Sequence, residues 1–381
     1  MILLMSHCIL LAFLTGTFIL QALKAFLIAI VFIGLTGCNQ ASDSASTSSS
    51  QPPLAVSRIH GQTMGTTYNI SFVAAEGFES LPLKQRVDGK LIAINKALST
   101  YDPSSELSLI NQGIRTTDTS GTIPISESLA EVLGQSLQVF RDSQGRFDVT
   151  VGPLVNIWGF GPEEAMNKKP SDERVQGLLA AIGSEKINLN PDAPSLALSS
   201  PLYIDLSAIA KGWAVDKIAE LLESDGIGDY LVEIGGELKT RGQKPGGTAW
   251  KIAVEKPAYQ MTAREGQLII EPGDMAVATS GDYRNYIEVD GVRFSHTIDP
   301  ATGYPITHNL ASVTVIHPSC AMADAWATAL NVAGPEEGLE LAERQQLAAY
   351  FIIREQEGFA VVTSTAFNEK FDHQLSSSDN H

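Results

Sequence analysis

Residues 229–243 read DYLVEIGGELKTRGQ, and this segment indicates most clearly how the chain folds. Apolar and polar residues alternate along it, as expected for a β-strand with one buried face. Residues 250–257, WKIAVEKP, alternate in the same way. The Gly-rich stretch between the two segments predicts a hairpin, so we expect the strands to be antiparallel.

Further strand-like segments follow one another in meanders and do not alternate strictly with helices. They lie at residues 57–73, 267–300, 311–318, 348–356 and 358–365. Segments whose apolar residues have helical spacing lie at 82–101, 125–145, 209–226, 319–334 and 334–347. This grouping favours an α+β fold of largely antiparallel sheets covered by helices on one side, in a single globular unit of two joined halves.

The N-terminal 37 residues contain no acid and a single basic residue, Lys24. A basic residue followed by a short apolar run and small residues is typical of a secretory signal. The run ends in LTGC, which is similar to a bacterial lipobox with Cys38 as the lipidated residue. The apolar stretch before Lys24 is long for a leader, so an uncleaved membrane anchor is the alternative.

Residues 39–53 are rich in Ser and Ala, which predicts a flexible tether. The expected parts are therefore a signal peptide (1–37), a tether (38–53), a folded domain (54–371) and a polar tail (372–381). We expect a lipid-anchored protein of the bacterial cell envelope that faces the periplasm, with the inner membrane favoured. Asn39 leaves the outer membrane open, because the usual retention signal is an Asp at this position.

Acidic residues outnumber basic ones by 43 to 26, giving a formal net charge of −17. This charge argues against nucleic acid and anionic lipid surfaces as partners, and an anionic ligand would need local positive charge or a metal. Cys8 and Cys38 lie in the leader region, so no internal disulfide framework is expected. We expect Cys320 to be a small buried apolar group, with a catalytic thiol as the lesser alternative.

The segment YIDLSAIAKGWAVD (203–216) places Asp205, Ser207, Lys211 and Asp216 around the start of a helix. Backbone amides at a helix start attract anions, and Lys211 adds a full charge. An ordinary capped helix with Lys211 in solvent would give the same pattern.

In CAMADAWATAL (320–330), Asp324 and Thr328 are four residues apart and share one face of a helix. A carboxylate among apolar residues needs a partner, and carboxylate, hydroxyl and carbonyl oxygens suit Mg²⁺. The alternative is a hydrogen bond from Thr328 to its own helix.

Two further stretches combine Gly, short hydroxyl residues and aromatic residues: MGTTY (64–68) and STYDPSSELS (99–108). Both would suit a planar ring ligand, although ordinary turns look much the same. Residues 145–161, GRFDVTVGPLVNIWGFG, are expected to form a short strand and irregular chain that either packs as a loop or lines a site. The Pro-rich stretch FSHTIDPATGYPITHN (294–309) either turns the chain or holds a ligand.

The ordered set of these blocks resembles the ApbE family, the FAD:protein FMN transferases. The resemblance extends over residues 58–365 and includes VEIGGE (232–237), TSGDYRNY (279–286), HTIDPATGYP (296–305) and ADAWATAL (323–330). It implies an enzyme that uses Mg²⁺ and takes FAD as its substrate. FMN would be attached through a phosphoester to a Thr or Ser of a target flavoprotein, with release of AMP.

The resemblance also implies a set of site residues. FAD would be contacted by Met64, Tyr101, Phe147, Asp148, Asp205, Lys211 and Ile298. The metal would be held by Asp324, Thr328 and the carbonyl of Ala208, with the carbonyl of Ala327 as a further candidate. His296 or Asp299 would accept the proton of the target hydroxyl.

Targets of the family include subunits of redox-driven, ion-pumping membrane complexes. One alternative is an FAD pyrophosphatase, which would use the same site with water as the acceptor. Another is a non-catalytic FAD-binding lipoprotein. A solute-receptor lipoprotein is less favoured, because it would predict two lobes with parallel sheets.

Overall fold

The computed structural model describes residues 52–115, 117–118, 121–161, 169–254, 268–281, 286–289 and 292–378. The predicted signal peptide, Cys38, the predicted tether up to residue 51 and the Asp-Gly pair at 290–291 lie outside these residues. Among the described residues, no helix has both the length and the apolar character needed to cross a bilayer.

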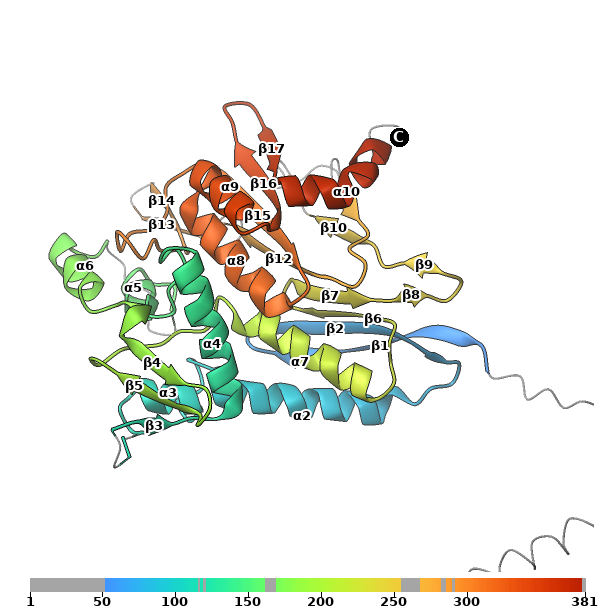
Figure 1. Cartoon of the computed structure of the whole chain (residues 1–381), viewed down its shortest axis with the longest axis horizontal. Coiled ribbons are helices and arrows are strands. Elements are labelled where there is room, and N and C mark those ends of the chain that lie inside the picture. The colour runs from blue at the N-terminus through green and yellow to red at the C-terminus, as the bar shows by residue number, and fades with distance from the viewer. Residues whose placement is uncertain are drawn as a thin grey trace, which may run out of the picture. The chain divides into compact units, whose positions relative to one another are not determined.

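An eight-stranded sheet forms the centre of the fold (Figure 1), in the order β1-β2-β6-β7-β12-β15-β16-β17. Every neighbouring pair in it is antiparallel. Its strands are β1 (Leu54–Thr63), β2 (Thr66–Ala75), β6 (Tyr230–Ile234), β7 (Glu237–Arg241), β12 (Ala276–Gly281), β15 (Leu310–His317), β16 (Ala348–Arg354) and β17 (Phe359–Thr363). The predicted α+β class with antiparallel strands is confirmed.

Residues 229–243 supply both β6 and β7, so the hairpin lies within this segment. Its turn is Gly235–Gly236, with φ angles of +63° and +109° that favour glycine. The Gly-rich stretch that follows joins only the short strands β8 (Gln243–Lys244) and β9 (Thr248–Ala249). The second segment forms β10 (Ile252–Val254), which pairs with β11 (Leu268–Ile270) outside the main sheet.

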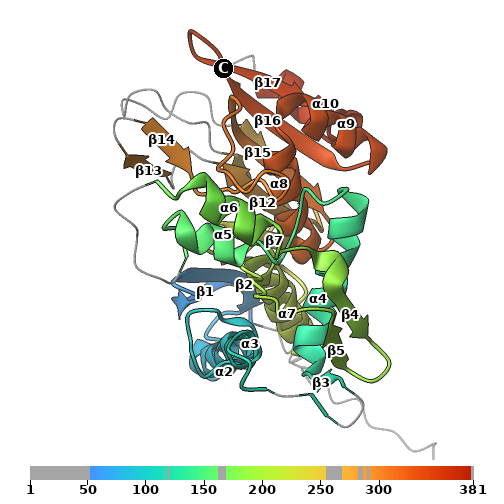
Figure 2. The same ribbon diagram turned by 90° about the vertical axis from the view of Figure 1, so that its left-hand side faces the viewer.

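Helices cover one face of the sheet, where α7 packs on β6 and β7, and α8 on β12 and β15 (Figure 1). The helices are α2 (Ser80–Leu98), α3 (Glu106–Asn111), α4 (Glu127–Asp142), α5 (Gly152–Ile157), α6 (Asp172–Leu179), α7 (Ala210–Ser224), α8 (Cys320–Ala333), α9 (Pro335–Arg344) and α10 (Thr365–Ser378). A small sheet of β3 (Ile123–Pro124), β5 (Ser195–Leu198) and β4 (Ile187–Asn190) lies beside α4 (Figures 1 and 2).

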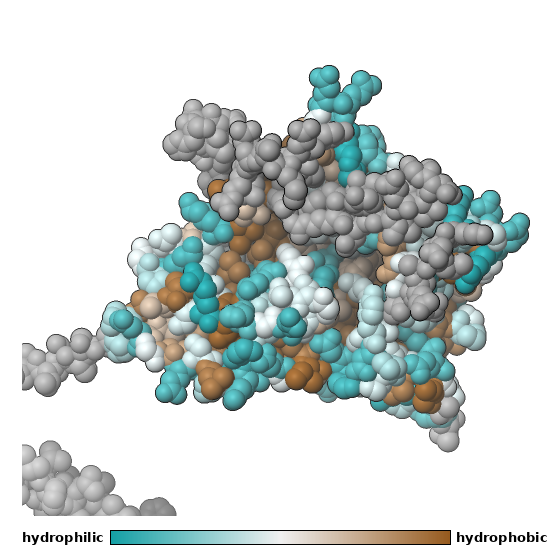
Figure 3. Space-filling view, turned by 180° about the vertical axis from the view of Figure 1, so that it is seen from behind, coloured by the Kyte–Doolittle hydropathy of each residue, from teal (hydrophilic) through white to brown (hydrophobic). Residues whose placement is uncertain are grey.

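Both faces of the sheet are buried at β15 and β16, which corrects the expectation of helices on one side. Val313 of β15 packs toward the helices, whereas Ala311 and Ile316 join a second core with β10, β11 and α10. The reason is visible in β16, since AAYFII is apolar at successive positions and thus on both faces, whereas β15 buries the small polar residues Ser312 and Thr314 between apolar ones. Seen from behind, apolar side chains are interspersed with polar ones on the surface (Figure 3).

The strand expected within residues 145–161 needs correction. Residues 145–161 contain a short helix, α5, and no strand; Pro153 lies in its first turn, where its fixed φ angle suits a helix. The predicted polar tail at 372–381 begins inside α10, which ends at Ser378, because Phe367 and Phe371 are buried in the second core and fix this helix. Within the strand-like segment 267–300, β13 (Tyr286–Val289) and β14 (Val292–Ser295) pair as an antiparallel hairpin.

Helices α7 and α8 approach each other closely at Gly212. A Cβ atom on Gly212 would lie 2.3 Å from the carbonyl oxygen of Cys320 and 2.8 Å from Cβ of Asp324. Only glycine therefore allows this distance between the two helices.

We expect Gly212→Ala to lower the free energy of unfolding by about 1–3 kcal/mol, because the added methyl group overpacks the α7–α8 contact. Gly89→Ala in α2 is the matched control, since its Cβ would meet nothing within 4 Å. The control should raise the free energy of unfolding by about 0.5–1 kcal/mol. Urea titration measures both, and a Gly212→Ala variant as stable as the control would contradict the constraint.

Candidate functional site

A cavity of about 650 Å³ lies where β6, β7 and β12 meet the start of α7 and the face of α8 that carries Asp324, Thr328 and Val332. Ten of the residues expected at the site line it, from segments far apart in the chain. They are Tyr101, Phe147, Asp148, Asp205, Ala208, Lys211, His296, Ile298, Asp324 and Thr328. Folding thus brings the expected flavin-, metal- and proton-handling residues to one place.

Met64, Ala327 and Asp299 do not line the cavity. Met64 occupies the β1–β2 turn at φ +50° and packs, partly buried, against the main core. Ala327 is fully buried in α8. The Asp299 carboxylate accepts hydrogen bonds from Ala301 N (2.9 Å) and Thr302 Oγ1 (3.2 Å), so it shapes its own turn.

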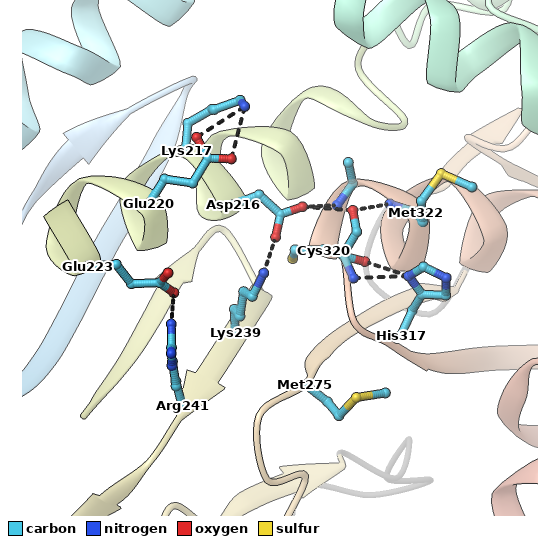
Figure 4. A network of polar contacts seen from close by, with 12 residues as sticks. Asp216, Lys217, Glu220, Glu223, Lys239, Arg241, Met275, His317, Cys320 and Met322 are labelled. Carbon is cyan, nitrogen blue, oxygen red and sulfur yellow. Dashed lines mark hydrogen bonds and ion pairs between the residues drawn. The ribbon is translucent and has the colours of Figure 1, made fainter. Parts of the chain in front are cut away.

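Helices α7 and α8 cap each other. The Asp324 carboxylate of α8 accepts a hydrogen bond from Gly212 N in the first turn of α7, at 3.1 Å. In return, Asp216 of α7 accepts hydrogen bonds from Ser319 Oγ (2.8 Å) and Ala321 N (3.1 Å) at the start of α8 (Figure 4). Carboxylates are favourable at both positions, because the free amides of a helix start carry partial positive charge.

Asp216 extends this network to the sheet through Lys239 of β7, whose Nζ lies 2.8 Å away (Figure 4).

Cys320, the first residue of α8, is fully buried, and its Sγ lies 3.5 Å from the carbonyl oxygen of Leu238. Burial raises the pKa of the Cys320 thiol, which therefore stays protonated. The prediction of a buried, apolar Cys320 is confirmed.

Lys211 reaches into the cavity between two carboxylates. Its Nζ lies 3.3 Å from Glu237 Oε1 and 3.8 Å from Asp324 Oδ2. Burial disfavours the charged ammonium, but Asp324 and Glu237 more than offset this effect and raise the pKa of Lys211. A Cβ on Gly235 would lie 3.2 Å from Cδ of Lys211, so the β6–β7 turn confines the stem of the side chain.

Glu237 holds an incompletely satisfied carboxylate against the cavity. Its Oε2 atom is buried and has no hydrogen-bond partner among the described residues. Burial raises the pKa of Glu237 to about 7, with Lys211 opposing the shift and Asp324 reinforcing it. Burial likewise raises the pKa of Asp324, again opposed by Lys211. The polar centre of the cavity therefore contains two carboxylates and one ammonium.

The oxygen atoms around this centre fit a hard divalent cation. Asp324 and Thr328 face the cavity from α8, Thr328 Oγ1 lies 3.3 Å from Ser280 Oγ, and Ala208 lines the opposite helix start. In the described part of the chain, no group of three His, Cys, Asp or Glu residues could hold a metal. Hydroxyl and carbonyl oxygens would have to complete the set, as they do at Mg²⁺ sites.

The loop at 147–151 forms another part of the cavity wall. Phe147 is buried, and the Asp148 carboxylate accepts hydrogen bonds from Thr150 Oγ1 and Ser184 Oγ, both at 2.6 Å. Asp148 thus shapes the loop with its side chain. Asp205 similarly accepts a hydrogen bond from Ser207 N (2.9 Å) before α7 begins.

Residues 296–306 fold into a stiff hairpin that carries His296 at the cavity wall. Ile298 pairs with Pro305, and Asp299 N donates to the carbonyl oxygen of Tyr304 at 2.9 Å. Trp158 Nε1 fixes the tip by donating to the carbonyl oxygen of Gly303 at 3.0 Å. The loop therefore both turns the chain and presents residues to the cavity.

Several cavity residues were not singled out from the sequence. They are Arg146, Glu233, Glu237, Thr279, Ser280 and Gly281. Glu233 and Glu237 lie in the block VEIGGE, and Thr279, Ser280 and Gly281 begin the block TSGDYRNY, so these residues belong to recognised blocks although the sequence alone assigned them no role. Arg146 gave no such signal; it is held by Glu337 of α9 at 2.6 Å and lies 3.7 Å from Asp299.

Comparison with known proteins supplies a family. A sequence profile of the ApbE family matches residues 64–351. An FAD:protein FMN transferase of Vibrio cholerae is 44% identical over 310 residues, which cover 81% of this chain and 91% of that protein. The solved flavin transferase ApbE from Vibrio cholerae matches with a TM-score of 0.76 at 43% identity, covering 83% of this chain and 99% of that one. The apo form of the Pseudomonas stutzeri flavinyl transferase ApbE gives a TM-score of 0.75 at 41% identity, covering 83% and 96%.

Glu237 should make stability depend on pH when divalent cations are removed with EDTA. Its pKa is raised from 4.5 to about 7 in the folded protein, so its contribution to stability is fully present below about pH 4.5 and is lost as pH rises through 7. We expect Glu237→Gln to remove this loss, a difference on the order of 2 kcal/mol between about pH 5 and pH 8 in urea titrations.

Glu220→Gln is the matched control, because Glu220 pairs with Lys217 on the exposed part of α7. That variant should keep the pH dependence of the unsubstituted protein. Equal pH dependence in both variants would show that Glu237 is not the group responsible.

Proposed function

Because the chain belongs to the ApbE family, we propose that it is an FAD:protein FMN transferase, which attaches FMN from FAD to a Thr or Ser hydroxyl of a target flavoprotein and releases AMP. The observation that carries this proposal is the common cavity of Ala208, Lys211, Asp324 and Thr328, with His296 on its wall. Three separate segments bring these residue types together, and a phosphoryl transfer needs such groups to stabilise the charge that develops in its transition state.

The start of α7 and Lys211 form the anion-binding part of the site. The helix has no side-chain cap of its own, and Asp205, Ser207 and Ala208 just before it line the cavity together with Lys211 in its first turn. Backbone amides at a helix start and a fixed ammonium stabilise phosphate oxygens. Lys211 is held by Glu237 and Asp324, so it is already in place before the pyrophosphate of FAD arrives.

Asp324, Thr328 and the carbonyl of Ala208 would hold Mg²⁺. When bound, the ion would neutralise pyrophosphate charge and act as a Lewis acid toward the phosphoryl oxygens. Glu237 Oε2 has no hydrogen-bond partner among the described residues, and burial disfavours the charged form of Asp324 and so raises its pKa; a cation there would stabilise both carboxylates, which supports this site.

The transfer replaces the phosphoanhydride bond of FAD by a phosphoester bond to the acceptor. The hydroxyl oxygen of the acceptor attacks the phosphorus on the riboflavin side, and the bond from that phosphorus to the bridging oxygen breaks. AMP leaves with the bridging oxygen and its electron pair. His296 accepts the hydroxyl proton in this scheme, since it lines the cavity whereas Asp299 is engaged in its own turn.

We also propose that the protein acts at the cell envelope. The support is the lipobox-like LTGC before Cys38 and the Ser- and Ala-rich segment that follows, which together describe a lipid anchor and a tether. Such an anchor would place the cavity close to membrane-bound flavoproteins, including subunits of redox-driven ion pumps.

The function is tested by incubating the protein with FAD, MgCl₂ and envelope proteins of the same cells, then measuring covalent flavin fluorescence after denaturing electrophoresis. We expect labelled protein and an equal amount of AMP. Release of AMP and FMN without labelling would support the pyrophosphatase, and FAD binding without either product would support a non-catalytic carrier.

Asp324→Asn should reduce transfer by at least about 100-fold, because it removes charge from the centre that stabilises the transferring group. Asp225→Asn, at the far end of α7 and paired with Arg86, is the control and should retain transfer. Equal rates in the two variants would exclude Asp324 from the reaction.

His296→Asn should lower kcat by about 100-fold, the usual contribution of a general base, with the affinity for FAD unchanged. FAD affinity is measured by quenching of flavin fluorescence. His60→Asn on the exposed side of β1 serves as the control. Full transfer by His296→Asn would assign proton removal to another group.

A further inference from the structure

Strand β12 continues past the point where it separates from β7. It pairs with β15 along its whole length, from Ala276 opposite His317 to Gly281 opposite Ser312. With β7 it pairs at only two positions, ending at Val277 opposite Leu238. In the described part of the chain, no strand pairs with residues 278–281 on the β7 side.

The direction of each backbone group of β12 follows from one hydrogen bond. Thr240 N of β7 donates to the carbonyl oxygen of Met275 at 3.0 Å, so the backbone groups of Met275 point toward β7. Alternate residues of a strand point their N–H and C=O groups to the same side. Thr279 and Gly281 therefore face the side that β7 has left.

This open edge lies inside the cavity. Thr279, Ser280 and Gly281 all line it, as do Gly236 and Glu237 of the β6–β7 turn across from them. A Cβ placed on Gly236 would meet nothing within 4 Å, so space remains between the turn and the edge of β12. An edge with free backbone groups is a template for pairing with another extended chain.

The geometry points to this edge as the docking site of the acceptor segment, which would add to β12 as an extended strand. The inference rests on the proposed transferase function, because that function requires a protein segment to enter the cavity. Main-chain hydrogen bonds from Thr279 and Gly281 bind the segment with little dependence on its sequence. Recognition would then come from the extended conformation and from a Thr or Ser of the segment at the polar centre.

The imide groups of the flavin ring could also form hydrogen bonds with this edge of β12. Two observations favour a peptide as its occupant. The outward residues Thr279 and Gly281 repeat every second residue, about 6.6–6.8 Å apart, which is the repeat of a paired strand. A flavin imide would engage only one of them. Ser280 Oγ of the same strand lies 3.3 Å from Thr328 Oγ1, so a segment along this edge runs beside the polar centre.

Thr279→Pro tests the edge directly. The N–H group of Thr279 faces the open side, so proline removes that donor without removing a hydrogen bond to β15. Thr314→Val in β15 is the matched control, because it removes the same hydroxyl contact to Thr279, at 2.8 Å, and leaves β12 unaltered. The acceptor is the best substrate of the unsubstituted protein among short peptides with one central Thr.

We expect Thr279→Pro to raise KM for this peptide about tenfold, with FAD affinity unchanged, because one main-chain hydrogen bond is lost and a peptide carbonyl is left unpaired. Thr314→Val should keep the original KM. An unchanged KM in the proline variant overturns the docking site. Weaker quenching of FAD fluorescence in the absence of peptide also overturns it, since the edge would then bind the flavin.

A second test leaves the protein unaltered. Peptides methylated at one backbone nitrogen at a time lose the donor at that position only. Docking along β12 predicts that KM rises at every second position near the Thr and stays unchanged between them. Absence of this alternation overturns docking while labelling of the parent peptide still upholds the transferase. A protein that labels no peptide and no envelope protein overturns both.

Discussion

The structure depends on the mutual capping of α7 and α8. Each helix begins with amides that need acceptors, and each supplies the carboxylate that satisfies the other, Asp324 at Gly212 and Asp216 at Ala321. A carboxylate buried among apolar residues is costly unless it is hydrogen-bonded, so the two helices are stable in this arrangement chiefly as a pair. Gly212 permits the close approach, and Lys239 ties the pair to the sheet.

The same contact creates the chemistry of the site. Asp324 is held at the first turn of α7 and is therefore brought close to Lys211, which also contacts Glu237 at the start of β7. Two buried carboxylates with one ammonium leave a net negative centre in a chain whose formal charge is −17. An anionic dinucleotide would be repelled by such a centre, and the proposed divalent cation is the simplest group that reverses this repulsion.

The main sheet contributes to the cavity because its strands end at different points. The tight turn at Gly235–Gly236 ends β6 and begins β7, whereas β12 continues past its pairing with β7 to Gly281. The cavity lies in the space left between them and is lined by backbone as well as side chains. Rigid strands on both sides make it a preformed site, which is the common situation for ligand pockets.

Local patterns in the sequence determined the elements of this fold. Alternation indicated β6, β7 and β15, helical spacing indicated α7 and α8, and a recognisable order of blocks led to most of the cavity residues. These signals depend on residues a few positions apart, so they can be recognised in the sequence without the tertiary structure. The unbroken apolar run of β16 also indicated burial on both faces of that strand, although it did not indicate the covering elements, β10, β11 and α10.

Only the tertiary structure decided which polar groups share a space. Gly212 and Asp324 are 112 positions apart and Asp216 and Ala321 are 105 apart, and no periodicity relates such distant residues. For this reason Glu237 and Arg146 emerged as cavity residues from the fold, while Met64, Asp299 and Ala327 were placed outside it. The open edge of β12 likewise depends on where a neighbouring strand ends, because pairing between strands is a property of two segments and not of either one.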